Sequence, residues 1–316
     1  MIAVTSVVLP YDQNFVGLDR SGIDIVNSRV IPFMRHDRIT LAGTAMALGV
    51  IYTALAWKGM REQWRWSRHA LLYAGVAEFA SMFLFMVIHY VDYVDPTHVI
   101  VSATLFPLFI LAVARPFTSR LHPSLDLTND RVWRRGLWGQ LLFVGLGAGV
   151  VGSGVTIWYI GITTVFVESD LSFLNTTAAR LIEANSRIVS LVAHDRAGLG
   201  GTLATIGIAV ALISLWGYRR GARWIWWTLL VSGGICFGCG ILAHVGVGYV
   251  EPGHLFPLFL SGTVFVIALW LSRPFLCDRF PSYARPANRA KRTQTHPVTS
   301  RGRQPARTAS PAQSKP

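Results

Sequence analysis

Charged residues are scarce in this 316-residue chain: they make up 14% of the sequence, while hydrophobic residues make up 52%. Soluble domains carry about 25% charged residues, so the composition excludes an ordinary soluble enzyme and favours a membrane protein. The three cysteines exclude a disulfide-stapled secreted scaffold. The sequence also lacks a phosphate-binding loop, a nucleophile elbow and a His-Glu-x-x-His motif, which narrows the enzyme classes that it could belong to. We expect a protein that is not an enzyme, although the sequence leaves an enzyme open.

Acidic residues are fewer than basic ones, 16 against 29, and much of the excess positive charge gathers near the C-terminus. Residues 276–316 hold nine Lys and Arg against a single acid, Asp278. This segment is rich in Pro, Arg and Ser, which predicts a disordered cytoplasmic tail. On a membrane protein, such a tail is typical of contact with anionic lipid headgroups rather than with nucleic acid.

Seven apolar segments are long enough to cross a bilayer, which takes about 20 residues per helix. Residues 1–9 are apolar but lack the basic start and the cleavage site of a signal peptide. We expect an all-α polytopic transmembrane helix bundle with spans near 39–58, 70–90, 98–115, 137–165, 197–217, 225–248 and 255–272.

The distribution of Lys and Arg between the loops predicts the orientation of these spans. Basic residues concentrate at 58–68, 115–135 and 219–223, which alternation of the spans places on the same side as the tail. The turns around 92–95 and at Glu251 carry acids and no Lys or Arg. The positive-inside rule therefore predicts a plasma-membrane protein with cytoplasmic basic loops and an outer side that holds the acidic turns.

The chain resembles itself when it is shifted by 158 residues. His-Asp-Arg at 36–38 returns at 194–196, and Asn-Ser-Arg at 27–29 returns at 185–187. At a local offset of 156, the segment 93–98 matches 249–254. Chance does not plausibly give so many matches in one register, so we predict a tandem parallel repeat of a four-helix unit.

The second repeat has four predicted spans, whereas the first has three. The first residues of the chain match the outer end of the fourth span, so we expect the first helix of repeat 1 to be missing. The predicted parts are membrane repeat 1, a cytoplasmic linker, membrane repeat 2 and the basic tail, at 1–117, 118–136, 137–275 and 276–316.

The positions shared by the two repeats are mostly polar and lie on the predicted outer side. A structural role accounts for them if Asp37 and Asp195 lie at helix N-termini, where acids satisfy free backbone amides, and if the arginines pair with outer acids. The charged members of this layer are Asp37, Arg38, Asp95, Asp195, Arg196 and Glu251.

Histidines accompany this polar layer. Neutral imidazole binds zinc, copper, iron and haem, and neighbouring carboxylates orient it, so we predict a haem or transition-metal site. The spacing matches no standard zinc motif, and a hydrogen-bonded structural role is the alternative. The candidate ligands are His36, His89, His98, His194, His244 and His254.

Glu78 is an acid inside a predicted span, about 12 Å from its cytoplasmic end at 1.5 Å per residue. An intramembrane acid is a candidate proton carrier, although a neutral, hydrogen-bonded packing residue is the alternative. Cys236 and Cys239 have the spacing of a redox motif, but they lie mid-span among glycines. Thiolates are unfavourable there, so we expect close helix packing.

Two stretches of the second repeat resemble an uncharacterised group of bacterial multi-span membrane proteins, some of which are labelled dihydroorotate dehydrogenase. The first comprises Gly-Ile-Thr-Thr-Val-Phe-Val-Glu-Ser-Asp from Gly161 and Ala-His-Asp-Arg-Ala-Gly-Leu-Gly-Gly from Ala193. The second runs from Leu-Ala-His at 242–244 to Gly-Tyr-Val-Glu-Pro-Gly-His at 248–254. The resemblance implies a bacterial membrane module that accompanies a redox enzyme; the chain itself has no flavin-binding barrel.

Three functions remain open on the sequence. The first is an accessory or scaffold module of the membrane, in which the repeated polar layer is architectural. The second is a membrane redox or metal- or haem-binding protein that uses the outer histidines, with a membrane or redox protein as partner. The third is a proton-coupled carrier of small solutes, with Glu78 as the proton-carrying group.

Overall fold

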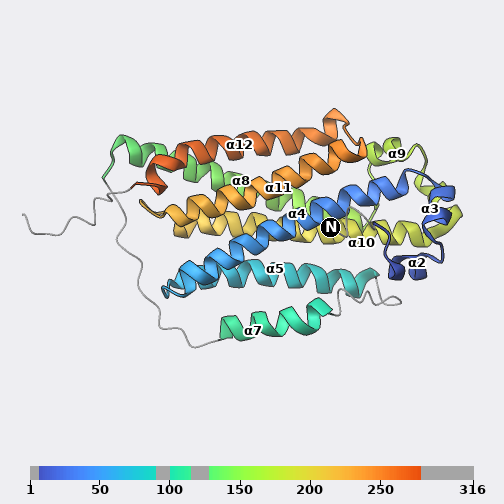
Figure 1. Ribbon diagram of the computed structural model, residues 1–316, viewed down its shortest axis with the longest axis horizontal. Coiled ribbons are helices and arrows are strands. Elements are labelled where there is room, and N and C mark those ends of the chain that lie inside the picture. Colours follow the sequence, from blue (N-terminus) through green and yellow to red (C-terminus); the bar gives the residue numbers. More distant parts are fainter. Residues whose placement is uncertain (1–6, 90–99, 115–127, 279–316) are drawn as a thin grey trace, which may run out of the picture. The chain divides into compact units, whose positions relative to one another are not determined.

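The computed structural model describes residues 7–89, 100–114 and 128–278, although not the side chains of 85–89, 101 and 102. All regular elements in these ranges are helices, and the long ones run side by side (Figure 1). In chain order they are α2 (Pro10–Val16), α3 (Arg20–Val26), α4 (Val30–Ala54), η1 (Leu55–Met60), α5 (Arg65–His89), η2 (Val101–Leu105), α7 (Phe106–Ala114), α8 (Arg131–Ile162), α9 (Glu168–Leu174), α10 (Ala178–Leu212), η3 (Ile213–Gly217), α11 (Arg223–Val247) and α12 (Pro252–Leu276).

The all-α bundle predicted from hydropathy is therefore confirmed, whereas the count of seven spans is not. Among the described residues, five helical segments are long and apolar enough to cross a membrane: Val30–Met60, Arg131–Ile162, Ala178–Gly217, Arg223–Val247 and Pro252–Leu276. The other two predicted spans coincide with α5, which carries Glu78, and with the shorter pair η2 and α7.

The two ends of the bundle differ in composition. The short helices α2, α3 and α9 gather at one end, called the outer end here (Figure 1). The opposite end, called the basic end, holds the starts of α5, α8 and α11 and the end of α12. Its arginines and lysine include Lys58, Arg61, Arg131, Arg223 and Arg273.

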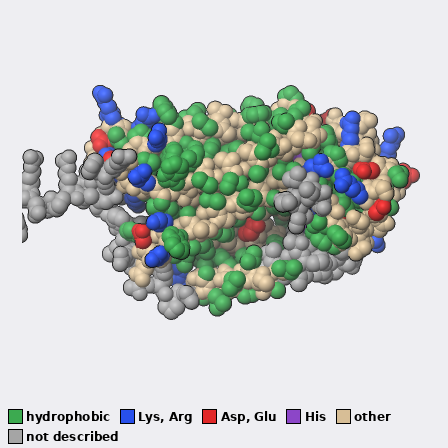
Figure 2. Space-filling model, in the orientation of Figure 1, with side chains coloured by type: hydrophobic (Ala, Val, Ile, Leu, Met, Phe, Trp, Pro, Cys, Tyr) green, Lys and Arg blue, Asp and Glu red, His purple; other side chains and the backbone are tan. Residues whose placement is uncertain are grey.

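Between these ends, the exposed side chains of the long helices are largely apolar. Trp138 on α8, Leu242 on α11 and Val266 on α12 are among the exposed residues. Figure 2 shows charged side chains mostly at the two ends, with hydrophobic and uncharged groups between them. A soluble protein rarely exposes so large an apolar area, whereas a helix surface in contact with lipid requires it.

Helix α10 lies at the centre of the packing because it contacts α4, α5 and α8. Glycines on α8 recur every seven residues at 147, 154 and 161, which places them on one face of that helix. A Cβ atom on Gly154 would lie 2.3 Å from the backbone nitrogen of Ala204, and one on Gly200 would lie 2.3 Å from that of Trp158. The two backbones therefore touch, as in other membrane helix pairs packed through small residues.

We expect Gly154→Ala to lower the free energy of unfolding by about 1–3 kcal/mol, because the added methyl group has to force α8 and α10 apart. The measurement is unfolding by sodium dodecyl sulfate from a mild detergent. Gly152→Ala is the matched control, since a Cβ atom there meets nothing within 4 Å. Equal responses of the two variants would contradict the close contact.

The outer end has a hydrophobic core of its own, built from both parts of the chain. Val16 of α2 and Phe33 of α4 pack in it together with Leu174 of α9 and Leu191 of α10. This cap holds the short outer helices against the long ones. The next polar residues inward include His36 and Asp37 on α4 and Asp195 and Arg196 on α10, and they adjoin the candidate site.

The expectation that Asp37 and Asp195 lie at helix N-termini is wrong. Helix α4 already begins at Val30, and α10 is helical again after a kink at Asn185, so both acids lie inside helices, and both side chains are buried. Their charges consequently have to be met by other side chains, because the backbone amides around them are already bonded within the helix.

Candidate metal centre

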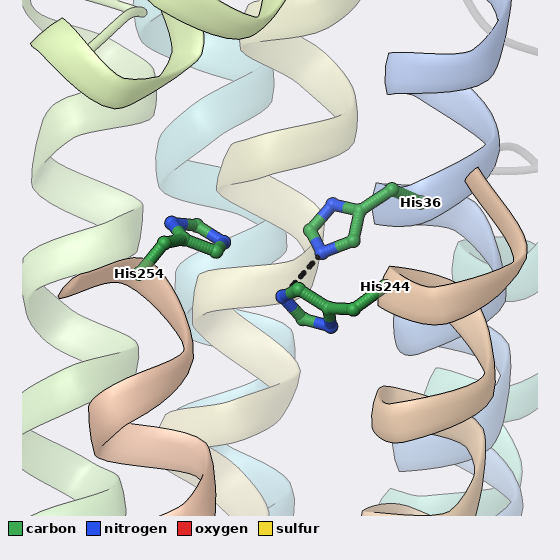
Figure 3. A group of neighbouring side chains, drawn as sticks. All are labelled: His36, His244 and His254. Carbon is green, nitrogen blue, oxygen red and sulfur yellow. Dashed lines mark hydrogen bonds between the residues drawn. The ribbon is translucent and has the colours of Figure 1, made fainter. Parts of the chain in front are cut away.

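Three histidines from three helices converge near the outer end. His36 lies on α4, His244 in the last turn of α11 and His254 in the first turn of α12. One ring nitrogen of each lies within 4.8 Å of one ring nitrogen of each of the others. Figure 3 shows the His254 ring facing the other two across a shared space. His36 and His244 are buried, and His254 is half-buried.

In His36 and in His244, the Nδ1 atom of the ring faces a hydrogen-bond acceptor. His36 Nδ1 lies 2.9 Å from Asp37 Oδ1, and His244 Nδ1 lies 2.7 Å from the carbonyl oxygen of Gly240. A carboxylate and a backbone carbonyl accept hydrogen bonds but do not donate them. Both Nδ1 atoms are therefore assigned as N–H donors, which leaves the Nε2 atom of each neutral ring with a lone pair.

These two Nε2 atoms face each other at 2.9 Å (Figure 3). Two neutral rings oriented in this way would direct lone pairs at one another, which is unfavourable in a buried site. The arrangement becomes favourable when a cation shares the lone pairs. That cation is either a proton, which makes one ring an imidazolium, or a metal ion.

The surroundings of His36 and His244 are those found around metal ligands. A histidine that binds a metal almost always donates its other N–H to a carboxylate or a backbone carbonyl, which fixes the tautomer and makes the ligand more basic. Asp37 supplies the carboxylate and Gly240 the carbonyl. Two of the three candidate ligands thus have the outer partner that a metal site requires.

His254 is positioned by the loop between α11 and α12. The Glu251 side chain accepts a hydrogen bond of 3.0 Å from the His254 backbone nitrogen and so caps α12. Tyr249 stacks on the His254 ring, with ring centroids 4.2 Å apart and an interplanar angle of 22°. Loop and cap together hold His254 opposite the other two rings.

Tyr249 connects the histidines to a buried ion pair. Its hydroxyl donates to Asp170 Oδ1 at 2.8 Å and also contacts Ser169 at 3.0 Å. Burial and the Asp170 carboxylate raise the pKa of the Tyr249 phenol, so it remains protonated and can donate. Asp170 pairs with Arg196 at 2.6 Å.

Arg38, which is half-buried, and Arg196, which is buried, each join one carboxylate from either half of the chain. Arg38 pairs with Asp12 at 2.6 Å and with Asp195 at 2.7 Å. Arg196 pairs with Asp170 at 2.6 Å and lies 3.6 Å from Asp37. Each residue of the Arg196 group lies 158 positions from the corresponding residue of the Arg38 group. Each arginine therefore binds one acid of its own half and one acid of the other half. We call these four ion pairs the crossed network.

The backbone contacts above the crossed network are reciprocal as well. Asn27 Nδ2 donates to the carbonyl oxygen of Leu174 at 2.9 Å, and Asn185 Nδ2 donates to that of Val16 at 3.0 Å. The arginines two residues after these asparagines also donate to carbonyl oxygens, Arg29 to that of Phe173 and Arg187 to that of Phe15. Each half of the chain therefore hydrogen-bonds to the short outer helix of the other half.

The structure brings together only part of the predicted histidine set. His36, His244 and His254 converge, whereas His194 lies on α10 beside Asp195, at 3.3 Å, and belongs to no such group among the described residues. The His89 side chain, His98 and Asp95 lie outside the described residues. The predicted pairing of the outer arginines with acids is found in the crossed network.

The remaining candidates lie deeper in the bundle. Glu78 Oε1 accepts a hydrogen bond of 2.9 Å from Thr202, and its role as a proton carrier stays a prediction. Cys236 Sγ lies 3.9 Å from the hydroxyl of Thr44, and Cys239 packs against Gly43 of α4. These contacts are those of close helix packing.

Sequence reasoning missed the Gly240 carbonyl and the place of Tyr249 beside His254. The signal for Gly240 was its position four residues before His244, where the side chain of a helical histidine can reach a carbonyl. The signal for Tyr249 was the sequence match of the segments 93–98 and 249–254, which share this tyrosine and the histidine five residues after it.

No protein-family model, curated protein or solved structure matches this chain.

Proposed function

We propose that the chain is a membrane metal-binding protein that holds one transition-metal ion between His36, His244 and His254 at its outer end. The observation that carries this proposal is the 2.9 Å distance between His36 Nε2 and His244 Nε2, on two rings whose Nδ1 atoms both face acceptors. Neutral imidazole ligands suit copper, zinc, iron and nickel.

The geometry favours a single ion over a haem. Haem iron takes its two axial ligands from opposite faces of a planar macrocycle, whereas these three nitrogens converge on one small space. Copper(II) is the metal that we expect to bind most tightly, because imidazole suits it and the affinities of divalent metals peak at copper.

The experiment is a metal titration of detergent-purified protein that has first been treated with a chelator. We expect the protein to retain about one copper(II) ion per chain after desalting. Its electron paramagnetic resonance spectrum should show splitting by several imidazole nitrogens. Zinc should compete with copper, but less tightly, as the order of metal affinities requires.

His69→Ala is the matched control for this titration. His69 lies on α5 at the basic end and contacts Tyr73 and Trp216 rather than the candidate ligands. The variant should retain copper like the unaltered protein. A folded protein that retains no metal would contradict the proposal, since the cation between His36 and His244 would then be a proton.

A second candidate function is that of an accessory or scaffold module of the membrane. The crossed network favours it, because its four ion pairs join the outer helices of both halves into one rigid unit. The metal-free outcome of the titration would leave this function as the better account. A membrane or redox protein as partner remains a prediction from the sequence.

We also infer that the two halves descend from one duplicated unit and that the basic end faces the cytoplasm. The reciprocal contacts at an offset of 158 residues support the duplication. The arginines at the start of α8 and α11 support the orientation, because cytoplasmic loops carry the excess of basic residues. The metal site would then lie on the extracytoplasmic side.

A further inference from the structure

A cavity of about 460 Å³ opens at the basic end, between the start of α11 and the end of α12, far from the histidines. Its size falls in the range of small-molecule sites. Its lining combines cationic and aromatic side chains: Arg223, Trp226, Trp227, Arg273, Pro274 and Cys277.

Within the described part of the chain, no carboxylate neutralises the positive charge of this cavity. Arg223 and Arg273 are exposed, and among residues 7–89, 100–114 and 128–278 neither forms an ion pair with a carboxylate. The neighbouring acids are engaged elsewhere, because Asp130 and Asp278 both pair with Arg220. The cavity therefore presents two guanidinium groups to which the described residues supply no anion.

The two arginines flank the same space. Burial raises the pKa of the Cys277 thiol, and the charges of Arg223 and Arg273 partly oppose this rise, so both guanidinium groups lie near the thiol. Arg223 also hydrogen-bonds this thiol. A ligand that entered the cavity would meet the two guanidinium groups from neighbouring helices.

Of the two tryptophans that line the cavity, Trp226 is held by a hydrogen bond and Trp227 is exposed. Trp226 Nε1 donates to the carbonyl oxygen of Leu269 at 3.0 Å, which ties α11 to α12. The Arg273 guanidinium lies 6.0 Å from the centroid of the Trp226 ring. Trp227 is 52% exposed. Tryptophan is enriched at the level of lipid headgroups, where its ring has one apolar side and one polar group.

We infer that this cavity binds the phosphate headgroup of an anionic phospholipid. Arg223 and Arg273 would hold the phosphate by bidentate hydrogen bonds, and Trp226 and Trp227 would cover the glycerol and the upper acyl chains. The site is formed by the helices themselves and is distinct from the predicted contact between lipid and the C-terminal tail. It is also independent of the proposed metal site.

The test is binding of dioleoylphosphatidylglycerol to delipidated full-length protein, measured by native mass spectrometry, with dioleoylphosphatidylcholine as the neutral comparison. We expect the anionic lipid to bind more tightly, and R223Q/R273Q to weaken it about 25-fold, at about fivefold per arginine. Because both arginines are exposed, the thermal midpoint of the variant should stay within a degree or two of the unaltered protein.

The matched control is R131Q/R134Q, which removes the same charge from exposed positions on α8 that do not line the cavity. This variant should bind phosphatidylglycerol nearly as well as the unaltered protein. If both double variants lost phosphatidylglycerol binding equally, the proposed site would be overturned, because the lipid would then be attracted to basic charge in general. Binding of inorganic phosphate alone, with no preference for the lipid, would overturn the lipid as ligand.

Discussion

Arg196→Ala should lower the free energy of unfolding by about 3–5 kcal/mol, the largest loss of stability that we expect from one substitution. Its guanidinium group is buried between Asp170 and Asp37 and also donates to the carbonyl oxygen of Val165. Removing the cation leaves two carboxylates in a buried site without their partner. The measurement is unfolding by sodium dodecyl sulfate from a mild detergent.

The controls separate the buried charge from arginine in general. Arg180 lies exposed at the outer end, so Arg180→Ala should change the unfolding free energy by less than about 0.5 kcal/mol. Asp170→Asn combined with Arg196→Met should cost less than the sum of the two single variants, because charge is removed from both sides of the pair. If the double variant lost as much unfolding free energy as the two single variants together, the ion pair between Asp170 and Arg196 would not account for the loss.

His244→Ala should weaken copper(II) binding by more than 100-fold, which is beyond the 10- to 100-fold that loss of an outer-shell partner costs. The substitution removes one ligand and also leaves His36 Nε2 without the atom that now lies 2.9 Å away. The measurement is competition with a chelator of known copper affinity, on protein whose fold is checked by its unfolding midpoint.

His194→Ala is the matched control for this loss. His194 lies 158 residues after His36 and likewise bonds the aspartate that follows it, but it is not among the three converging rings. Copper binding at the site of His36, His244 and His254 should be unchanged in this variant. If instead copper were lost from His194→Ala and kept by His244→Ala, the proposed ligands would be wrong.

Hydropathy predicted the helices with exposed apolar faces well, because contact with lipid demands long apolar runs. The predicted span 137–165 coincides closely with α8, Arg131–Ile162. Where a helix carries buried charge, the same reasoning failed. The predicted span 197–217 covers only the second part of α10, which already begins at Ala178. His194, Asp195 and Arg196 resemble an outer loop in sequence.

The reason for this failure is physical. The charges within α10 are tolerated because their partners come from other segments: Asp170 lies 26 residues before Arg196, and Arg38 lies 157 residues before Asp195. No local pattern contains that information. The repeat indicated which polar positions matter, but it did not show that the ion pairs cross between the halves.

The candidate site was predictable to a similar extent. Six histidines were predicted as ligands, and three of them converge in the described part of the chain. Convergence depends on how α4, α11 and α12 pack, since His36 lies 208 residues before His244. The tautomers, which carry the functional argument, depend on Asp37 and Gly240 and become visible only with the three-dimensional arrangement.

The crossed network also constrains the order in which the chain can mature during its synthesis. Arg38 leaves the ribosome 157 residues before Asp195, which is about 8–30 s at 5–20 residues per second. Throughout that interval the first half holds Arg38 and Asp37 without their second-half partners. The first half therefore reaches its final packing around Arg38 and Asp37 only after the second half has been made.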